Sequence, residues 1–169
     1  IEQSLLDSIK RTSHRIEIVS SERIRDEFIK ILKTNKPSIG IIILQKSGLL
    51  KYIFPEVDIM YGMDQTSEWH HKDIFTHTLQ VVDNAAKLTK KMEIRFAALV
   101  HDIAKPQTRR IDKNKGYTFH GHDAVGEKMI DKIAVRMKLP NALKFYLKKL
   151  TLLHLRPIAL VKDIVTDSA

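Results

Sequence analysis

Hydrophobic residues recur at helical spacing along most of the chain. Ile24, Phe28 and Ile31 fall at i, i+4 and i+7, after two serines that can cap a helix and before Pro37. The same spacing predicts later helices over about 73–90, 94–104, 122–138, 141–155 and 158–167. Only the apolar run 39–44 is also compatible with a strand. The pattern therefore predicts an all-α protein.

Breaks in the periodicity suggest two helical units. A short helix is predicted from Pro37 to Gly48, and Pro55 closes another short piece. Residues 56–72 are poorly periodic, and we interpret them as a connection. The predicted units are a small helical unit over residues 1–60 and a larger helical domain over 61–169.

One segment of the second unit, residues 106–121, lacks helical periodicity. Its first residue, Pro106, disfavours helix in the residue before it, and the sequence Lys113-Asn114-Lys115-Gly116 is typical of a turn. This segment predicts a loop or a short β-hairpin.

The composition narrows the chemistry that is possible. The chain has 169 residues, 43% of them hydrophobic and 29% charged, as in soluble globular proteins, and no apolar run approaches the roughly 20 residues of a membrane span. It has no cysteine, which excludes disulfides, a thiol nucleophile and a cysteine-ligated zinc site, and which fits a cytoplasmic location. Any bound metal must use histidine and carboxylate ligands.

The net charge of +9 is unevenly distributed. Residues 1–60 carry 10 basic and 8 acidic side chains, whereas residues 61–169 carry 19 and 12. Such an excess favours anionic partners, and we expect nucleic acid or a phosphorylated small molecule, although a solvated surface is the ordinary explanation of a charge run.

Potential metal ligands occur on the apolar stripes of the predicted helices: His77, His101, Asp102, His122 and His154. His77, for example, shares its face with Ile74 and Val81. A lone histidine on such a stripe is ordinarily a hydrogen-bonded core residue. Several of them beside an aspartate, which is costly to bury without a partner, predict a metal site. Mn, Ni, Fe, Zn and Mg all fit these ligands, as one ion or two, and could activate water for attack on phosphorus.

These residues resemble a known signature. His77, the pair His101-Asp102 and the distant Asp167 look like the motif of the HD superfamily of metal-dependent phosphohydrolases. The strings 75–79, 101–106 and 119–126 resemble more closely the HD domain of bacterial tRNA nucleotidyltransferases and poly(A) polymerases.

The first unit is similar to another part of the same family. The strings 18–24, 47–50 and 53–56 resemble the helical neck that precedes the HD domain. The nucleotidyltransferase head, with its Gly-Ser turn and paired aspartates, has no match here. We expect a fragment of a longer nucleotidyltransferase that does not add nucleotides by itself. The chain begins at Ile1 rather than at methionine and ends in a short polar segment.

The resemblance implies roles for individual residues. The principal metal would be bound by His77, His101, Asp102 and Asp167, with Asp163 as the alternative to the last of these. His122 and His154 occupy positions that hold a second metal in some HD proteins. The implied catalytic residues are Asp102 and Lys105. Residues placed to contact RNA or a substrate phosphate are Lys105, His120, Arg109, Arg110, Lys113 and Lys115. Lys105 could instead complement the helix dipole.

Two functions follow as hypotheses. The first is hydrolysis of a phosphomonoester, phosphodiester or 2′,3′-cyclic phosphate by a metal-bound hydroxide. The second is a non-catalytic RNA-binding body that positions tRNA for the absent head and keeps a vestigial metal site. A third reading, in which the histidines are only core residues, predicts no metal loss when they are substituted.

Overall fold

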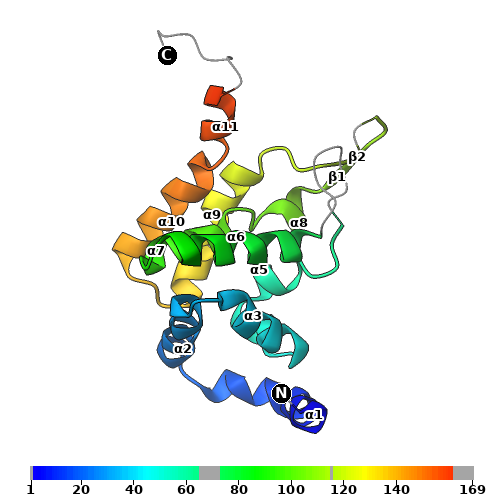
Figure 1. The fold of residues 1–169 in the computed structure, drawn as a ribbon, viewed down its shortest axis with the longest axis vertical. Helices are drawn as coiled ribbons and strands as arrows, with labels where there is room; N and C mark the ends of the chain where they lie inside the picture. Colours follow the sequence, from blue (N-terminus) through cyan, green and yellow to red (C-terminus); the bar gives the residue numbers. More distant parts are fainter. Residues whose placement is uncertain (1, 65–72, 115, 162–169) are drawn as a thin grey trace.

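The computed structural model describes residues 2–64, 73–114 and 116–161. These residues are mostly helical, which confirms the expected all-α class (Figure 1). In the first unit the elements are α1 (Gln3–Thr12), the 3-10 helix η1 (Ser13–Ile18), α2 (Ser21–Lys33), α3 (Pro37–Lys46), α4 (Leu50–Ile53) and α5 (Pro55–Asp58). In the described part of the chain, no helix is both long enough and apolar enough to cross a membrane.

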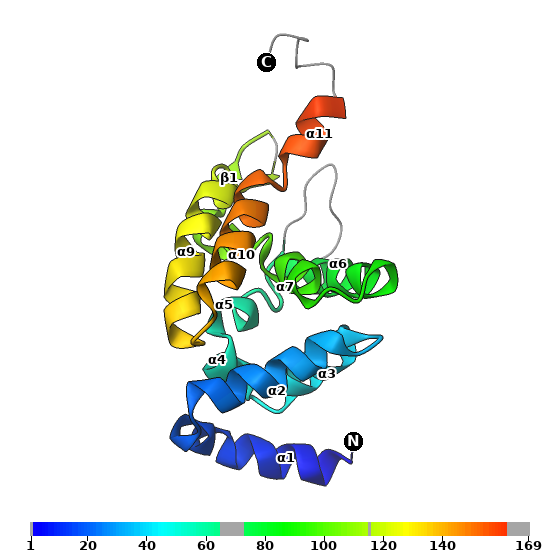
Figure 2. The ribbon, with the colours of Figure 1, turned by 90° about the vertical axis from the view of Figure 1, so that its left-hand side faces the viewer.

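The remaining elements lie after residue 73. They are α6 (Ile74–Leu88), α7 (Met92–Val100), α8 (Lys105–Thr108), β1 (Arg110–Asp112), β2 (Gly116–Thr118), α9 (His122–Arg136), α10 (Asn141–Leu153) and α11 (Arg156–Val161). The antiparallel pair of β1 and β2 confirms the predicted hairpin. Helices α9 and α10 lie side by side in both views (Figure 2).

Several boundaries of the first unit follow from local chemistry. The side chain of Ser20 accepts a hydrogen bond from the backbone N–H of Arg23, as expected for a helix cap. Pro37 begins α3, so the ambiguous run 39–44 is helical. Helix α1 lies outside the predicted elements although Leu5, Leu6 and Ile9 fall at helical spacing, and it buries none of its residues.

Pro55 and Pro106 each stand in the first turn of a short helix, α5 or α8, because the N–H that proline lacks is not needed there. The short piece before Pro55 does end, at Ile53 of α4, as predicted, whereas the loop expected from residue 106 is wrong at its start, where α8 lies. Helix α7 ends at Val100 and not at residue 104, and a turn follows over residues 101–104. This turn positions the histidine–aspartate pair described below.

Both units share one hydrophobic core. Phe28 of α2, Phe54 before α5 and Phe96 of α7 are fully buried, with ring centroids 5.6 to 6.3 Å apart. Arg95 is also fully buried, and its guanidinium donates to backbone carbonyls at the ends of α2 and α6. Helix α7, which precedes the histidine–aspartate pair, is therefore packed directly against the first unit.

Candidate metal centre

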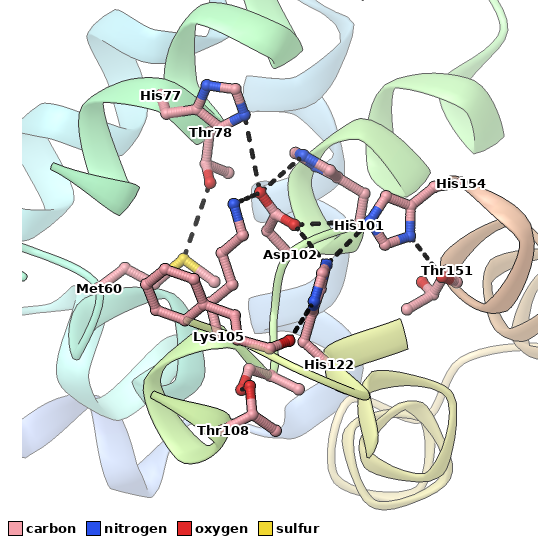
Figure 3. Close-up of polar contacts among 12 residues, drawn as sticks. Met60, His77, Thr78, His101, Asp102, Lys105, Thr108, His122, Thr151 and His154 are labelled. Atoms are coloured by element: carbon pink, nitrogen blue, oxygen red, sulfur yellow. Dashed lines mark hydrogen bonds and ion pairs between the residues drawn. The ribbon is translucent and has the colours of Figure 1, made fainter. Parts of the chain in front are cut away.

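The carboxylate of Asp102 is the centre of a cluster of imidazoles from four parts of the chain (Figure 3). Asp102 follows the end of α7 and is 2% exposed. His77 comes from α6, His122 from the first turn of α9, and His154 from the end of α10. The turn after α7 therefore lies where three other helices converge.

Each oxygen of this carboxylate faces two imidazoles. Oδ2 lies 3.1 Å from Nε2 of His101 and 3.6 Å from Nε2 of His77. Oδ1 lies 3.2 Å from Nε2 of His122 and 3.6 Å from Nε2 of His154. The arrangement forms two groups of three potential ligands that share Asp102.

Three of the imidazoles are held by the backbone of their own turn. Nδ1 of His101, His122 and His154 lies 2.8, 2.7 and 2.6 Å from the carbonyl oxygen of the third residue before it. A carbonyl only accepts, so each Nδ1 carries the proton that it donates. The neutral form of each ring then presents an unprotonated Nε2 to the centre, which is the form that binds metals.

The contacts within the cluster shift the pKa values of Asp102 and His154. Burial raises the pKa of Asp102, but hydrogen bonds from His101, His122 and His154 outweigh it and hold that pKa well below its usual range. Burial lowers the pKa of His154, but hydrogen bonds to Asp102 and to the carbonyl of Thr151 raise it overall. The cluster thus favours a negative carboxylate beside positive charge.

The donor set fits a divalent cation. Nε2 of His122 and Nε2 of His154 are only 3.1 Å apart, so two neutral rings in the form described would place two lone pairs against each other. A proton or a cation between them removes this conflict. Imidazole nitrogens with one shared carboxylate and no sulfur are suited to first-row transition metals.

Lys105 also belongs to this cluster. Its Nζ lies 2.8 Å from Oδ2 of Asp102, and the residue is 7% exposed. The ammonium group also lies 5.4 Å from the ring centroid of Phe119. Because α8 begins at Lys105, this residue starts a helix rather than completing the dipole of α7.

A cavity of about 1000 Å³ opens onto the cluster. One wall is aliphatic and includes Leu150, Leu153 and Leu155, which the sequence analysis did not assign to a site. Another part of the lining comes from the hairpin and includes Tyr117, whose ring centroid lies 3.7 Å from the guanidinium of Arg109. In the sequence, the aromatic residues of the predicted hairpin were the feature that could have indicated this part of the cavity.

The other predicted residues are dispersed. His120 lines the same cavity and is exposed, and Arg110 and Lys113 are exposed on the hairpin. None of these three belongs to the cluster around Asp102 among the contacts of the described residues. The positions of Lys115, Asp163 and Asp167 lie outside the described residues.

Comparison with protein families gives two matches. Residues 1–60 match the family described as "Probable RNA and SrmB- binding site of polymerase A". Residues 74–165 match the family described as "HD domain". No nucleotidyltransferase head is detected. The second match spans more than half of the chain and contains every residue of the histidine cluster, so the chain belongs to the HD domain family.

Proposed function

We propose that this chain is a metal-dependent phosphohydrolase that cleaves a phosphate ester. The observation that carries the proposal is the shared carboxylate of Asp102, each oxygen of which faces two imidazole Nε2 atoms. In this proposal His77 and His101 hold one cation with Asp102, and His122 and His154 hold another. Asp167, or Asp163 in its place, adds a further ligand to the first.

A bound divalent cation supplies two kinds of chemistry, lowering the pKa of water toward neutrality and withdrawing charge from a phosphoryl oxygen. The chain's own residues prepare the ligands for this. The carbonyls of Ala98, Phe119 and Thr151 fix the proton of three rings on Nδ1. Nε2 of each ring therefore needs no rearrangement to bind.

Lys105 is proposed to hold the substrate phosphate. Its ammonium is buried beside Asp102 at the floor of the cavity, where the charge of a phosphoryl oxygen would develop. Low exposure strengthens this interaction because water does not screen it.

The cavity supports an ester with a sizeable organic group. Its volume of about 1000 Å³ exceeds the need of a phosphate alone, and its walls are largely aliphatic and aromatic. A phosphomonoester, a phosphodiester or a 2′,3′-cyclic phosphate would each place charge at the histidines and the organic group against these walls.

The test combines metal analysis with turnover of a chromogenic phosphodiester. Asp102→Asn should lose metal from both groups and reduce turnover by at least about 100-fold, because both depend on the same carboxylate. Asp7→Asn, on the exposed face of α1, is the matched control and should change neither. Full metal content and full turnover in Asp102→Asn would exclude the proposed centre.

The alternative is a non-catalytic body that positions RNA. The match of residues 1–60 to an RNA-binding region favours an RNA partner, and we infer a parent nucleotidyltransferase in the cytoplasm from the same match. This alternative predicts salt-sensitive RNA binding with no turnover by the metal-loaded chain.

A further inference from the structure

A second cavity, separate from the metal centre, lies between α3 and α6. It has a volume of about 600 Å³ and is formed by residues from both family-matched regions. Helices α3 and α6 are neighbours in Figure 2 and pack against each other. We call this cavity the α3–α6 groove; the lining residues used below are Lys36, Lys46, Tyr61, Asn84 and Lys87.

The α3–α6 groove is positively charged. Lys36, Lys46 and Lys87 line it and are exposed. Among the described residues its acidic lining residue is Asp83, and both oxygens of that carboxylate are engaged. Oδ1 accepts from the backbone N–H of Ser38 at 3.0 Å and Oδ2 from the hydroxyl of Ser38 at 2.7 Å. The carboxylate therefore caps α3, and the lysines are left to attract an anion.

An aromatic ring lies in the same groove. Tyr61 is 61% exposed, and its ring meets that of the buried Phe75 edge-on, with centroids 5.6 Å apart. This contact supports the ring while most of its surface remains accessible. The side-chain amide of Asn84 adds a donor and an acceptor along α6. A basic groove with an exposed ring is the arrangement that binds single-stranded nucleic acid.

The lysines are spread along the groove, as the phosphates are along a nucleic-acid strand. The contact between Ser38 and Asp83 places the start of α3 beside the second half of α6, so Lys36 and Lys87 share one end of the groove. Lys46 stands at the other end of α3, about 15 Å away at 1.5 Å per residue. Successive phosphates of a strand match lysines that are spread over this length.

We propose that the α3–α6 groove binds single-stranded RNA, whose phosphates contact Lys36, Lys46 and Lys87 and one base of which stacks on Tyr61. The proposal does not depend on the metal chemistry. It differs from the expectation that RNA follows the basic hairpin residues. Since α6 also carries His77, a strand in this groove lies along the helix that contributes to the metal centre.

The first test measures binding of a fluorescein-labelled oligoadenylate of about twelve nucleotides by fluorescence anisotropy over a range of salt, with chelator present. The triple variant Lys36→Gln, Lys46→Gln and Lys87→Gln should lower the log–log salt slope by about 2, at about 0.7 per phosphate contact. The control triple Lys128→Gln, Lys132→Gln and Lys149→Gln removes the same charge from exposed positions of α9 and α10. An equal decrease in both triples would overturn the proposal.

The second test separates stacking from charge. Tyr61→Ala should weaken binding roughly 5- to 100-fold with an unchanged salt slope, and Tyr61→Trp should retain affinity. The thermal midpoints of these variants should match the parent because Tyr61 is exposed. An unchanged affinity in Tyr61→Ala would overturn the stacking contact. If adenosine monophosphate competed as strongly as the oligomer, the proposal that the groove binds a strand would be overturned, and a mononucleotide site would be indicated.

Discussion

At the scale of single residues, a variant of Lys105 can distinguish the role of the metal centre from that of the basic hairpin surface. Lys105→Met should reduce turnover of a small phosphodiester by about 100-fold or more, because a preorganised charge is removed from the developing oxyanion. It should leave the salt dependence of RNA binding unchanged, since its ammonium is buried against Asp102. Steady-state kinetics and a salt titration check both parts.

Arg110 and Lys113 serve as the opposite control. Both are exposed, and the double variant Arg110→Gln, Lys113→Gln should retain turnover. If hairpin residues also track RNA, the salt slope should decrease by about 1.4, at about 0.7 per contact. Equal effects of Lys105→Met and the double variant in both assays would contradict the separation.

The shared carboxylate also links metal binding to unfolding. Four imidazoles face Asp102, so a cation that binds only the folded state should stabilise it, by about 2.7 kcal/mol at a hundredfold excess over the dissociation constant. Chelation should therefore lower the thermal midpoint of metal-loaded protein, as measured by calorimetry. An unmoved midpoint on removal of metal would contradict the centre, and Asp102→Asn should be insensitive to chelator.

The gathering of histidines around Asp102 could be predicted because histidines on apolar stripes conflict with burial. His77 and His122 were recognised on this basis. The partners of their rings could not be predicted in the same way. Whether Nδ1 of His154 reaches the carbonyl of Thr151 depends on the geometry of a helix end, which the hydrophobic pattern does not specify.

At the scale of elements, Gly126 sets the distance between α9 and α10. A Cβ atom there would lie 2.9 Å from Cγ2 of Thr151, whose carbonyl holds His154. We expect Gly126→Ala to cost about 1 to 3 kcal/mol through overpacking, partly offset by about 1 kcal/mol of helix propensity. The displaced Thr151 should also reduce the metal content of the group containing His122 and His154.

Gly40 offers a matched control for this prediction. Its Cβ would lie 2.5 Å from Ile31, between α2 and α3 and away from the histidines. Gly40→Ala should therefore lower stability without a loss of metal. The measurement is the metal content of the two folded variants, Gly126→Ala and Gly40→Ala. An equal loss of metal in both would show that Gly126 has no particular link to the centre.

Arg95 joins the ends of two helices. Its guanidinium donates to the carbonyls of Leu32, Thr34, Ala86 and Thr89 at 2.8 to 3.0 Å. Arg95→Met should lower the free energy of unfolding by about 3 to 5 kcal/mol, because four acceptors, two in buried and two in part-buried bonds, lose their donor at about 1 kcal/mol or more each. Urea titration measures this loss.

Arg136 provides the comparison for Arg95. Its side chain is 38% exposed and pairs with Glu56, so Arg136→Met should cost about 1 kcal/mol or less. A similar cost for both arginines would mean that the buried caps at α2 and α6 contribute little.

Periodicity predicted the long helices because each buries one face. Helices α6, α9 and α10 begin within a residue or two of the predicted positions. The short elements depend on other causes. The end of α7 at Val100 could not be predicted, because Ile103 and Ala104 beyond it are also buried and the hydrophobic pattern does not distinguish a buried turn from a buried helix.

At the scale of the whole molecule, the two family-matched regions share a core and should unfold together. Phe54 belongs to the first region and contacts Phe96 of α7, the helix that precedes His101. Phe54→Ala should cost about 3 to 5 kcal/mol. Helical circular dichroism and metal release should then report one coincident transition at a lower midpoint. Two separate transitions would contradict a common core.

The backbone contacts of the three imidazoles have a consequence for how such a centre can change over evolutionary time. Many metal sites need an additional carboxylate or amide to orient each histidine, and that partner must be retained along with the ligand. For His101, His122 and His154 the orienting group is a carbonyl of the same turn, present whatever side chain stands there. The surrounding residues are therefore free to drift and reshape the cavity for other substrates, provided that the turns persist.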